Sequence, residues 1–209
     1  MNWFHLNEFM VLRSRRVRIL QWIYLRLCAI PRGSVLVVTI VNARETPMKD
    51  DEIRQIVDIE SRPEVKQWLI IDSDEDFENE LRGYRQFLAG LRDNENAEVL
   101  VAKIDERVAG FLALWRLEKY MAHVASIGIS VHPDIWGKGV AKNLMEAAIK
   151  LAREKGFKRL EIETMAENVA MRKAAERMGF KYEGVRVNRI WKNGVYHDEV
   201  LYYLLLDDD

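Results

Sequence analysis

The chain has 209 residues, of which 49% are hydrophobic and 31% are charged, and its formal net charge at pH 7 is −1. This length and apolar content can bury one sizeable core, so the composition predicts a single main domain. The near-zero charge gives no reason to expect nucleic acid or an anionic membrane as a partner. Cys28 is the only cysteine, which excludes an intramolecular disulfide and favours a reducing, cytoplasmic environment.

Residues 1–34 differ in composition from the rest of the chain. They are rich in aromatic and arginine side chains, and their apolar run over 19–30 is interrupted by Gln21 and Arg26. This run is shorter than the ~20 apolar residues that span a bilayer, and it lacks the small-residue cleavage site of a signal peptide. Three interpretations remain open: an added amphipathic helix, a weak anchor at a membrane surface, or sequence upstream of the true start. We favour an appendage or a misassigned start, with the main domain at 35–209 and no firm membrane association.

Turn residues and hydrophobic periodicity divide the first half of the main domain into a strand, two helices and two more strands. Pro47 is expected in the first turn of the first helix, where a residue needs no hydrogen-bonded N–H. In chain order, we predict a strand over 36–43, a helix from Pro47 carrying Ile53, Ile56 and Val57, a loop marked by Pro63 and by the acidic run 72–75, a helix over 77–92, and strands over 97–104 and 108–117 joined at 105–107.

In the second half, strands and helices alternate before a final hairpin. Asn193-Gly194, between two runs rich in apolar residues, is a strong signal for a two-residue type I′ turn. In chain order, we predict a strand over 123–131, a helix from Val140 that ends at Gly156, a strand over 160–165, a helix over 168–178, and a hairpin of strands over 182–192 and 195–206.

The joint between the strand over 123–131 and the helix from Val140 is the most informative segment. It reads His-Pro-Asp-Ile-Trp-Gly-Lys-Gly-Val-Ala-Lys over 132–142, with a lysine between Gly137 and Gly139. Glycine lets backbone N–H groups approach a ligand closely, and a helix N-terminus adds unsatisfied N–H donors and a positive dipole end. The segment therefore predicts an anion site, and a phosphate suits it best.

Two common phosphate loops do not fit this segment. A nucleoside-triphosphate loop requires Gly, four residues and then Gly-Lys-Ser/Thr, and the sequence contains no such string. A dinucleotide fingerprint requires Gly-x-Gly-x-x-Gly, but Lys142 occupies the third glycine position. A glycine-rich turn without a ligand remains the alternative.

The motif Trp-x-x-Gly-x-Ala over 136–141 resembles the acyl-CoA signature of the GCN5-related N-acetyltransferases, whose first position is usually Gln or Arg. A second segment, over 168–180, resembles the later motif of that family, in which an asparagine opens a helix that closes in Gly-Phe. Asn168 and Gly179 also suit the cap positions at the two ends of this helix. The resemblance covers roughly residues 39–206.

The resemblance implies an α/β fold of the α+β type, with a mixed, mostly antiparallel sheet and helices on both faces. It implies acetyl transfer from acetyl-CoA to a primary amine by direct attack in a ternary complex, without a covalent enzyme intermediate. The residues implied in acetyl-CoA binding are Ile129, Val131, Trp136, Gly137, Lys138, Gly139, Val140, Ala141, Lys142 and Asn168. For Lys138 and Lys142 a solvated helix face is the alternative. Trp136 is expected to cap the loop and to leave phosphate binding to backbone N–H groups.

The resemblance also suggests two candidates for the base that takes a proton from the amine. Glu163, five residues before the motif asparagine, aligns with a glutamate that some members use, and a surface glutamate paired with a lysine is the alternative. His123 is the second candidate, with a hydrogen-bonded strand residue as its alternative. Many members carry a tyrosine seven residues after the asparagine, but here the residue is Ala175. Tyr182, Tyr196 or water would then protonate the leaving thiolate.

The expected acceptor is a small amine, an amino acid or a protein N-terminus, and the sequence does not choose among them. The histidines show no metal-ligand spacing, so no metal is expected. Homodimers are common among similar proteins, but no residue here demonstrates one. The rival interpretation is a non-catalytic sensor that binds acyl-CoA, which Ala175 and the N-terminal segment would suit.

Overall fold

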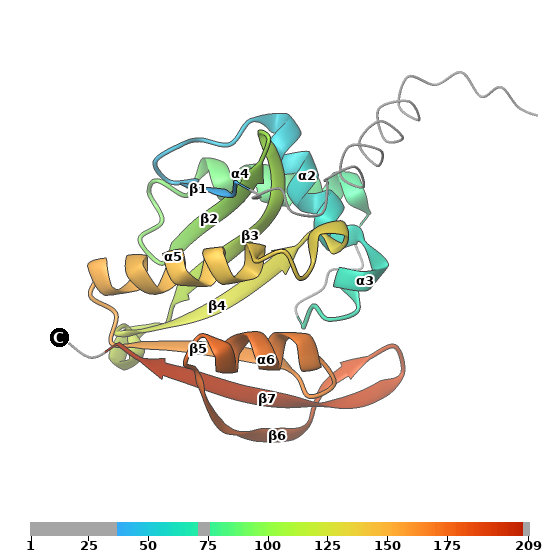
Figure 1. The fold of residues 1–209 in the computed structure, drawn as a ribbon, viewed down its shortest axis with the longest axis vertical. Coiled ribbons are helices and arrows are strands. Elements are labelled where there is room, and N and C mark those ends of the chain that lie inside the picture. Colours follow the sequence, from blue (N-terminus) through green and yellow to red (C-terminus); the bar gives the residue numbers. More distant parts are fainter. Residues whose placement is uncertain (1–36, 71–75, 207–209) are drawn as a thin grey trace, which may run out of the picture. The chain divides into compact units, whose positions relative to one another are not determined.

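The computed structural model describes residues 37–70 and 76–206, which form a seven-stranded sheet flanked by helices (Figure 1). The predictions for residues 1–34 and for the acidic run 72–75 lie outside the described residues. The strands are β1 (Thr39–Asn42), β2 (Ala97–Ile104), β3 (Arg107–Arg116), β4 (Val124–Val131), β5 (Arg159–Met165), β6 (Lys181–Lys192) and β7 (Val195–Leu205). The helices are α2 (Asp50–Ser61), α3 (Pro63–Lys66), α4 (Phe77–Ala89), α5 (Val140–Glu154) and α6 (Val169–Arg177), with short 3₁₀ turns at Lys119–Met121 and Pro133–Ile135.

The strand order is β1-β2-β3-β4-β5-β7-β6, and every neighbouring pair is antiparallel except β4 and β5. These two parallel strands pair only between Val124–Ser126 and Arg159–Glu161. Beyond these pairs the ladder stops, while β4 continues to Val131 and β5 continues to Met165. The sheet is therefore open between the later halves of its two central parallel strands.

Helices cover both faces of the sheet, as the resemblance implied. Figure 1 shows α5 and α6 in front of the strands, and α5 packs on β2, β3 and β4. The buried residues of α5 are Val140, Leu144, Met145, Ala148 and Ala152. On the other face, α2 and α4 share a core with β2 and β3 that includes Ile56, Ile59, Tyr84, Leu88, Val99, Val101, Phe111 and Ala113.

Near two prolines in the first half of the domain, the predicted helix boundaries were wrong. Helix α2 begins at Asp50 instead of Pro47, because the backbone N–H of Lys49 donates to the Glu52 carboxylate (2.8 Å) and closes the helix end there. The acidic first turn also suits the positive end of the helix dipole. Pro63, predicted in a loop, is the first residue of α3, a position where a missing N–H costs no hydrogen bond.

The final hairpin is confirmed in its turn. Asn193 and Gly194 have φ values of 52° and 80°, as a type I′ turn requires. Asp105 and Glu106 also have positive φ values, 48° and 63°, so the β2–β3 hairpin has a two-residue turn as well. Arg107, predicted in that turn, is instead the first residue of β3. Within residues 37–70 and 76–206, no helix is both long and apolar enough to cross a bilayer.

Candidate active site

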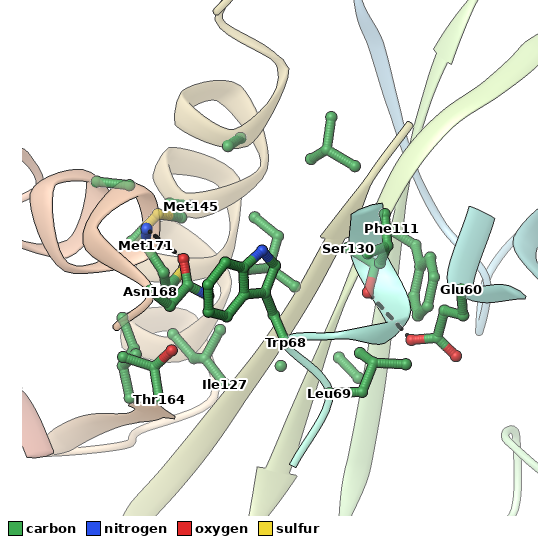
Figure 2. Close-up of a pocket in the computed structure, with 18 of the residues that line it drawn as sticks. Glu60, Trp68, Leu69, Phe111, Ile127, Ser130, Met145, Thr164, Asn168 and Met171 are labelled. Atoms are coloured by element: carbon green, nitrogen blue, oxygen red, sulfur yellow. Dashed lines mark hydrogen bonds between the residues drawn. The ribbon is translucent and has the colours of Figure 1, made fainter. Parts of the chain in front are cut away.

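A cavity of about 1500 Å³ occupies the opening between β4 and β5, and its lining residues come from helices on both faces of the sheet. Figure 2 shows Glu60, Ser130 and Phe111 on one side of it and Asn168 and Met171 on the other. We call the part lined by α5 and α6 the cofactor half, and the part lined by α2 and α4 the acceptor half.

The strand register decides which side chains face each half. Phe111, buried in the core beneath α2 and α4, pairs directly with Ser130. Directly paired residues lie on one face of a sheet and alternate residues share it, so Ser130 and Gly128 face the acceptor half. Ile127 and Ile129 point the other way and line the cofactor half. The end of β4 thus presents small or polar residues to one half and apolar residues to the other.

The N-terminus of α5 opens into the cofactor half without a cap. Gly137 and Gly139 have φ values of 75° and 84°, a region that favours glycine, and a Cβ on either would meet no atom within 4 Å. No side chain caps the helix, and its first turn contains no acidic residue. The first-turn N–H groups over 140–142 have no partner within the helix. Together with the helix dipole they form a site for an anion.

The loop before α5 is held by its own side chains. The indole Nε1 of Trp136 donates to the carbonyl oxygen of Val131 at 2.8 Å, which ties the loop to the end of β4. The Nδ1 of His132 accepts from the backbone N–H of Asp134 at 3.3 Å. Burial lowers the pKa of His132, so the ring is neutral at pH 7 and adds no charge to the anion site. Trp136 therefore fixes the shape of the loop, and the groups available to an anion are the backbone N–H groups.

The second helix start, at α6, is capped. The Oδ1 of Asn168 accepts from the backbone N–H of Met171 at 3.1 Å, as the dashed line in Figure 2 marks. Gly179 follows the helix with a φ of 85°. Both cap predictions are confirmed. Because the cap uses the side-chain oxygen, the amide nitrogen of Asn168 is the group that it offers to a ligand.

The residues predicted to bind acetyl-CoA line the cavity, with the exception of Lys138. Those in the lining are Ile129, Val131, Trp136, Gly137, Gly139, Val140, Ala141, Lys142 and Asn168. Lys138 is exposed, and its backbone N–H donates to the carbonyl oxygen of Ile135 at 3.3 Å. The side chain of Lys142 also forms an exposed ion pair with Glu146 at 3.5 Å.

Glu163 lies in the cavity wall on the face of the acceptor half. Ser126 pairs with Glu161, and Glu163 follows two residues later on the same face. The guanidinium of Arg186 donates to Glu163 (2.9 Å) and to the buried Glu199 (2.8 Å). The side chain of Glu163 is 36% exposed, so an arginine orients its carboxylate while the group still reaches the cavity.

The structure does not bring His123 to the cavity. This residue precedes β4 at the end where β4 and β5 are paired, and its side chain is exposed. Its carbonyl oxygen accepts from the N–H groups of Lys158 (2.8 Å) and Arg159 (3.3 Å). The full length of β4, at about 3.3 Å per residue, separates it from Val131 and the glycine-containing loop before α5. The geometry gives no support to His123 as a base.

No tyrosine stands where the family would place an acid for the thiolate. Ala175 is completely buried and does not line the cavity. Tyr182 also lies outside the lining, and Tyr196 packs on Trp191 near the hairpin turn, with ring centroids 4.4 Å apart. Among the described residues, the hydroxyls in the lining are those of Tyr84, Ser126, Ser130 and Thr164. The same residues contain no group of three or more His, Cys, Asp or Glu side chains suited to a metal ion.

Sequence reasoning missed a polar cluster in the acceptor half. The Oγ of Ser130 donates to one carboxylate oxygen of Glu60 at 3.0 Å, and the hydroxyl of Tyr84 donates to the other (Figure 2 draws the first bond). A signal for it existed in α2. Glu60 continues the helix face that Ile53 and Ile56 begin, at spacings of three and four residues. A carboxylate on a buried apolar face needs a partner or a function.

Residues 67–70 form another wall of the cavity. Figure 2 shows the Trp68 side chain between the side of the cavity with Asn168 and the side with Ser130. The Nζ of Lys192, at the end of β6, donates to the carbonyl oxygens of Lys66 and Leu69, both at 2.7 Å. The β6–β7 hairpin therefore holds this wall from outside the cavity.

Strands β4 and β5 separate beside the uncapped N-terminus of α5. This arrangement is typical of proteins that can hold a long, phosphate-bearing ligand between two strands of their sheet. Residues 53–180 match the Acetyltransferase (GNAT) family, and the chain belongs to this family. The matched range contains both the glycine-containing loop before α5 and the capped start of α6. The family resemblance drawn from the two motifs is confirmed, and so is the mixed, mostly antiparallel fold.

Several known proteins are similar to this chain. A Bacillus subtilis (strain 168) protein named as a candidate alanine N-acetyltransferase of ribosomal protein bS18 is 27% identical over 108 residues, which is 52% of this chain and 70% of that protein. The structure of yncA from Salmonella typhimurium, described as an acetyltransferase with acetyl-CoA, has a TM-score of 0.66 at 20% identity and covers 82% of this chain and 95% of its own. An Acinetobacter baylyi acetyltransferase structure has a TM-score of 0.69 at 21% identity, covering 84% and 97%.

Proposed function

We propose that this chain is an N-acetyltransferase that moves the acetyl group of acetyl-CoA to a primary amine by direct attack in a ternary complex. One observation carries the proposal. A continuous cavity leads from the uncapped N-terminus of α5, through the opening between β4 and β5, to a chamber with carboxylates on the other face. A phosphate-bearing thioester and an amine could thus reach one point from opposite sides of the sheet.

The cofactor half suits acetyl-CoA as a substrate. Backbone N–H groups of Gly137 and of residues 139–142 would bind the pyrophosphate, and the apolar opening beside Ile127 and Ile129 would take the pantetheine arm. The edge of β4 beyond Ser126 has no ladder with β5. Backbone N–H groups freed near Ile129 and Val131 would then polarise the thioester carbonyl and stabilise the negative charge that develops on its oxygen.

The amine must lose a proton before it attacks. For an alkylamine with a pKa of ~10.4, deprotonation at pH 7 costs about 5 kcal/mol, whereas an α-amino group near pKa ~8 costs about 1 kcal/mol. We assign the base to Glu163, which Arg186 orients on the face from which the acceptor enters. The proton passes to this carboxylate directly or through water, the nitrogen–carbon bond forms, and the carbon–sulfur bond breaks. The nitrogen loses its second proton as the amide forms, and the thiolate takes up this proton through water or a nearby hydroxyl.

Thiol release from acetyl-CoA tests the proposal. The protein would be incubated with separate pools of polyamines, amino acids, aminoglycosides and short peptides with varied N-termini. Release with one pool supports the enzyme and names its acceptor class. The alanine at position 175 favours a second candidate, a sensor that binds acyl-CoA without turnover. A sensor would release no thiol with any pool, yet acetyl-CoA at one hundred times its Kd would stabilise it by about 2.7 kcal/mol.

A further inference from the structure

A row of small side chains crosses three strands on the face of the sheet that α2 and α4 cover. Gly128 pairs with Ala113, and Ala113 pairs with Val99, so one residue from each of β4, β3 and β2 shares this face. All three residues line the cavity. Among the described residues of β2, Val99 is the only one in the lining, so the cavity reaches this strand at the end of the row. The row is therefore the floor of a slot that begins at Gly128.

Aromatic side chains form the two walls of this slot. Phe111 and Trp115 lie on β3, two residues before and two residues after Ala113, and point to the same face. Helix α4 adds a second ring to each: Phe87 stacks on Trp115 with centroids 4.9 Å apart, and Tyr84 meets Phe111 edge to face at 6.1 Å. All four rings line the cavity. Trp115 is 42% exposed, so its pair is the outer wall, between the slot and solvent.

Helices α2 and α4 close the slot over the sheet. Ile56 of α2 and Leu88 of α4 pack in the core on this face, and both line the cavity. The hydrogen-bonded pair of Ser130 and Glu60 lies in the neighbouring row, because Ser130 follows Gly128 by two residues on β4. The floor itself has no polar side-chain atom. An apolar floor between aromatic walls suits a hydrocarbon chain.

The slot leads away from Gly128 in the direction opposite to Glu163. Strands β3 and β5 flank β4 on its two sides, and the slot runs over β3 whereas Glu163 lies on β5. In the proposed reaction the thioester lies at Gly128, its sulfur arrives from the cofactor half, and the amine approaches beside Glu163. The path over β3 and β2 is then left for the acyl chain that the carbonyl carbon carries.

We propose that this protein also transfers linear, saturated acyl groups longer than acetyl, and that the slot from Gly128 to Val99 binds their hydrocarbon tail. Two strand spacings make the slot about 10 Å long. An extended chain with C–C bonds of about 1.5 Å advances about 1.3 Å per carbon, so about six to eight carbons fill this length. The inference rests on the proposed function and extends its acyl donor. The chemical step is unchanged: the nitrogen–carbon bond forms, the carbon–sulfur bond breaks, and CoA leaves as a thiol with a proton that the nitrogen loses.

Calorimetry without an amine tests the slot by comparing donors that differ in the acyl chain alone. Hexanoyl-CoA has four more methylenes than acetyl-CoA, and burying each one is worth up to about fourfold in affinity. We expect hexanoyl-CoA to bind at least about thirtyfold more tightly than acetyl-CoA. Butyryl-CoA should bind at least about tenfold more tightly than succinyl-CoA, which has the same number of acyl carbons but ends in a carboxylate. Equal affinities in either pair would overturn the proposal.

Substitutions in the slot should act on the longer donor. Ala113→Leu fills the space between Gly128 and Val99, and it should reduce the ratio of hexanoyl-CoA to acetyl-CoA affinity to about threefold or less. If this variant does not fold, Trp115→Ala opens the outer wall at a partly exposed residue and should lower the same ratio at least about fivefold. An unchanged ratio in either folded variant would count against the slot.

Thiol release separates this inference from the proposed function. With an amine pool that gives release from acetyl-CoA, hexanoyl-CoA should also release thiol. Tighter binding of hexanoyl-CoA without release from either donor supports the slot but contradicts the transfer and the proposed function. Release from acetyl-CoA alone, or release from acetyl-CoA with equal affinities for the two donors, overturns this inference and leaves the proposed function intact.

Discussion

The two halves of the cavity are assembled in different ways. The cofactor half is built from two continuous segments, each a strand end followed by the start of a helix, at α5 and α6. The acceptor half depends on residues far apart in the chain: Glu60 meets Tyr84 across 24 positions and Ser130 across 70. A half made from local segments can be recognised from a sequence motif, whereas a half made from distant residues becomes visible only once the chain is folded. Substitutions can test whether the two halves also act separately.

The largest effect is expected where the cofactor half would meet phosphate. In Gly139→Glu, a carboxylate at the N-terminus of α5 repels the phosphate and competes for the same N–H groups. We expect acetyl-CoA affinity to fall by about 1,000-fold, or about 4 kcal/mol, as measured by calorimetry.

Gly156→Glu is the matched control for this change, because it lies just beyond the other end of α5. Its φ is 75°, against 84° for Gly139, and a Cβ at either position meets no atom within 4 Å. Both variants should therefore lose similar stability from backbone strain. Unchanged acetyl-CoA affinity in Gly139→Glu would refute the assigned position of the phosphate loop.

The next effect is expected where the two halves join. Gly128 faces the acceptor half at the opening between β4 and β5, and a Cβ there would meet no atom within 4 Å. Gly128→Leu should fold normally but fill the space between amine and thioester, lowering kcat/KM more than about 100-fold. Gly184→Leu, at a similarly open position of β6 outside the lining, should keep full activity. Normal turnover in Gly128→Leu with an unaltered melting temperature would show that the substrates meet elsewhere.

Glu163 provides the test of the chemical step. Glu163→Gln should lower kcat/KM about 100-fold at pH 7, within the range of general-base catalysis. The loss should shrink at pH 9, because more of an alkylamine with a pKa of ~10.4 is already neutral there. Glu161→Gln is the control, since Glu161 lies on the same strand and face, is ion-paired with Arg159 and does not line the cavity. A loss of equal size at both pH values would argue against the role of Glu163 as base.

The smallest effect is expected from loosening one wall of the cavity. Lys192→Met removes the two bonds that hold the carbonyl groups of Lys66 and Leu69. Because this wall borders the acceptor half, the KM for the amine should rise about fivefold, equivalent to about 1 kcal/mol, while acetyl-CoA affinity stays unchanged. A matching loss of acetyl-CoA affinity would mean that the two halves do not act separately.

The sequence predicted what local chemistry decides. The glycine conformations at 137 and 139, the Asn168 cap and the Asn193-Gly194 turn each depend on neighbouring residues, and the structure has all three. The preference of Pro47 for a first turn predicts a helix start there, but the Lys49–Glu52 bond makes the helix begin three residues later, at Asp50. The family resemblance suggests His123 as a base, but a strand has two distant ends and only one end of β4 reaches the cavity.

The partners of the acidic residues could not be predicted in the same way. The Arg186 partner of Glu163 comes from β6, which reaches β5 only through β7 in the strand order. The Glu60 partners come from α4 and β4, and no spacing rule connects these three elements. A charged residue on the apolar face of α2 was the one local sign of this cluster.

The structure of the complex with acetyl-CoA tests the central claim most directly. The account predicts that the pyrophosphate lies on the backbone N–H groups of Gly137 and of residues 139–142, and that the thioester lies between β4 and β5 at Gly128, open to the acceptor half. A pyrophosphate bound away from the N-terminus of α5, or a thioester that does not enter the opening between the strands, would contradict it.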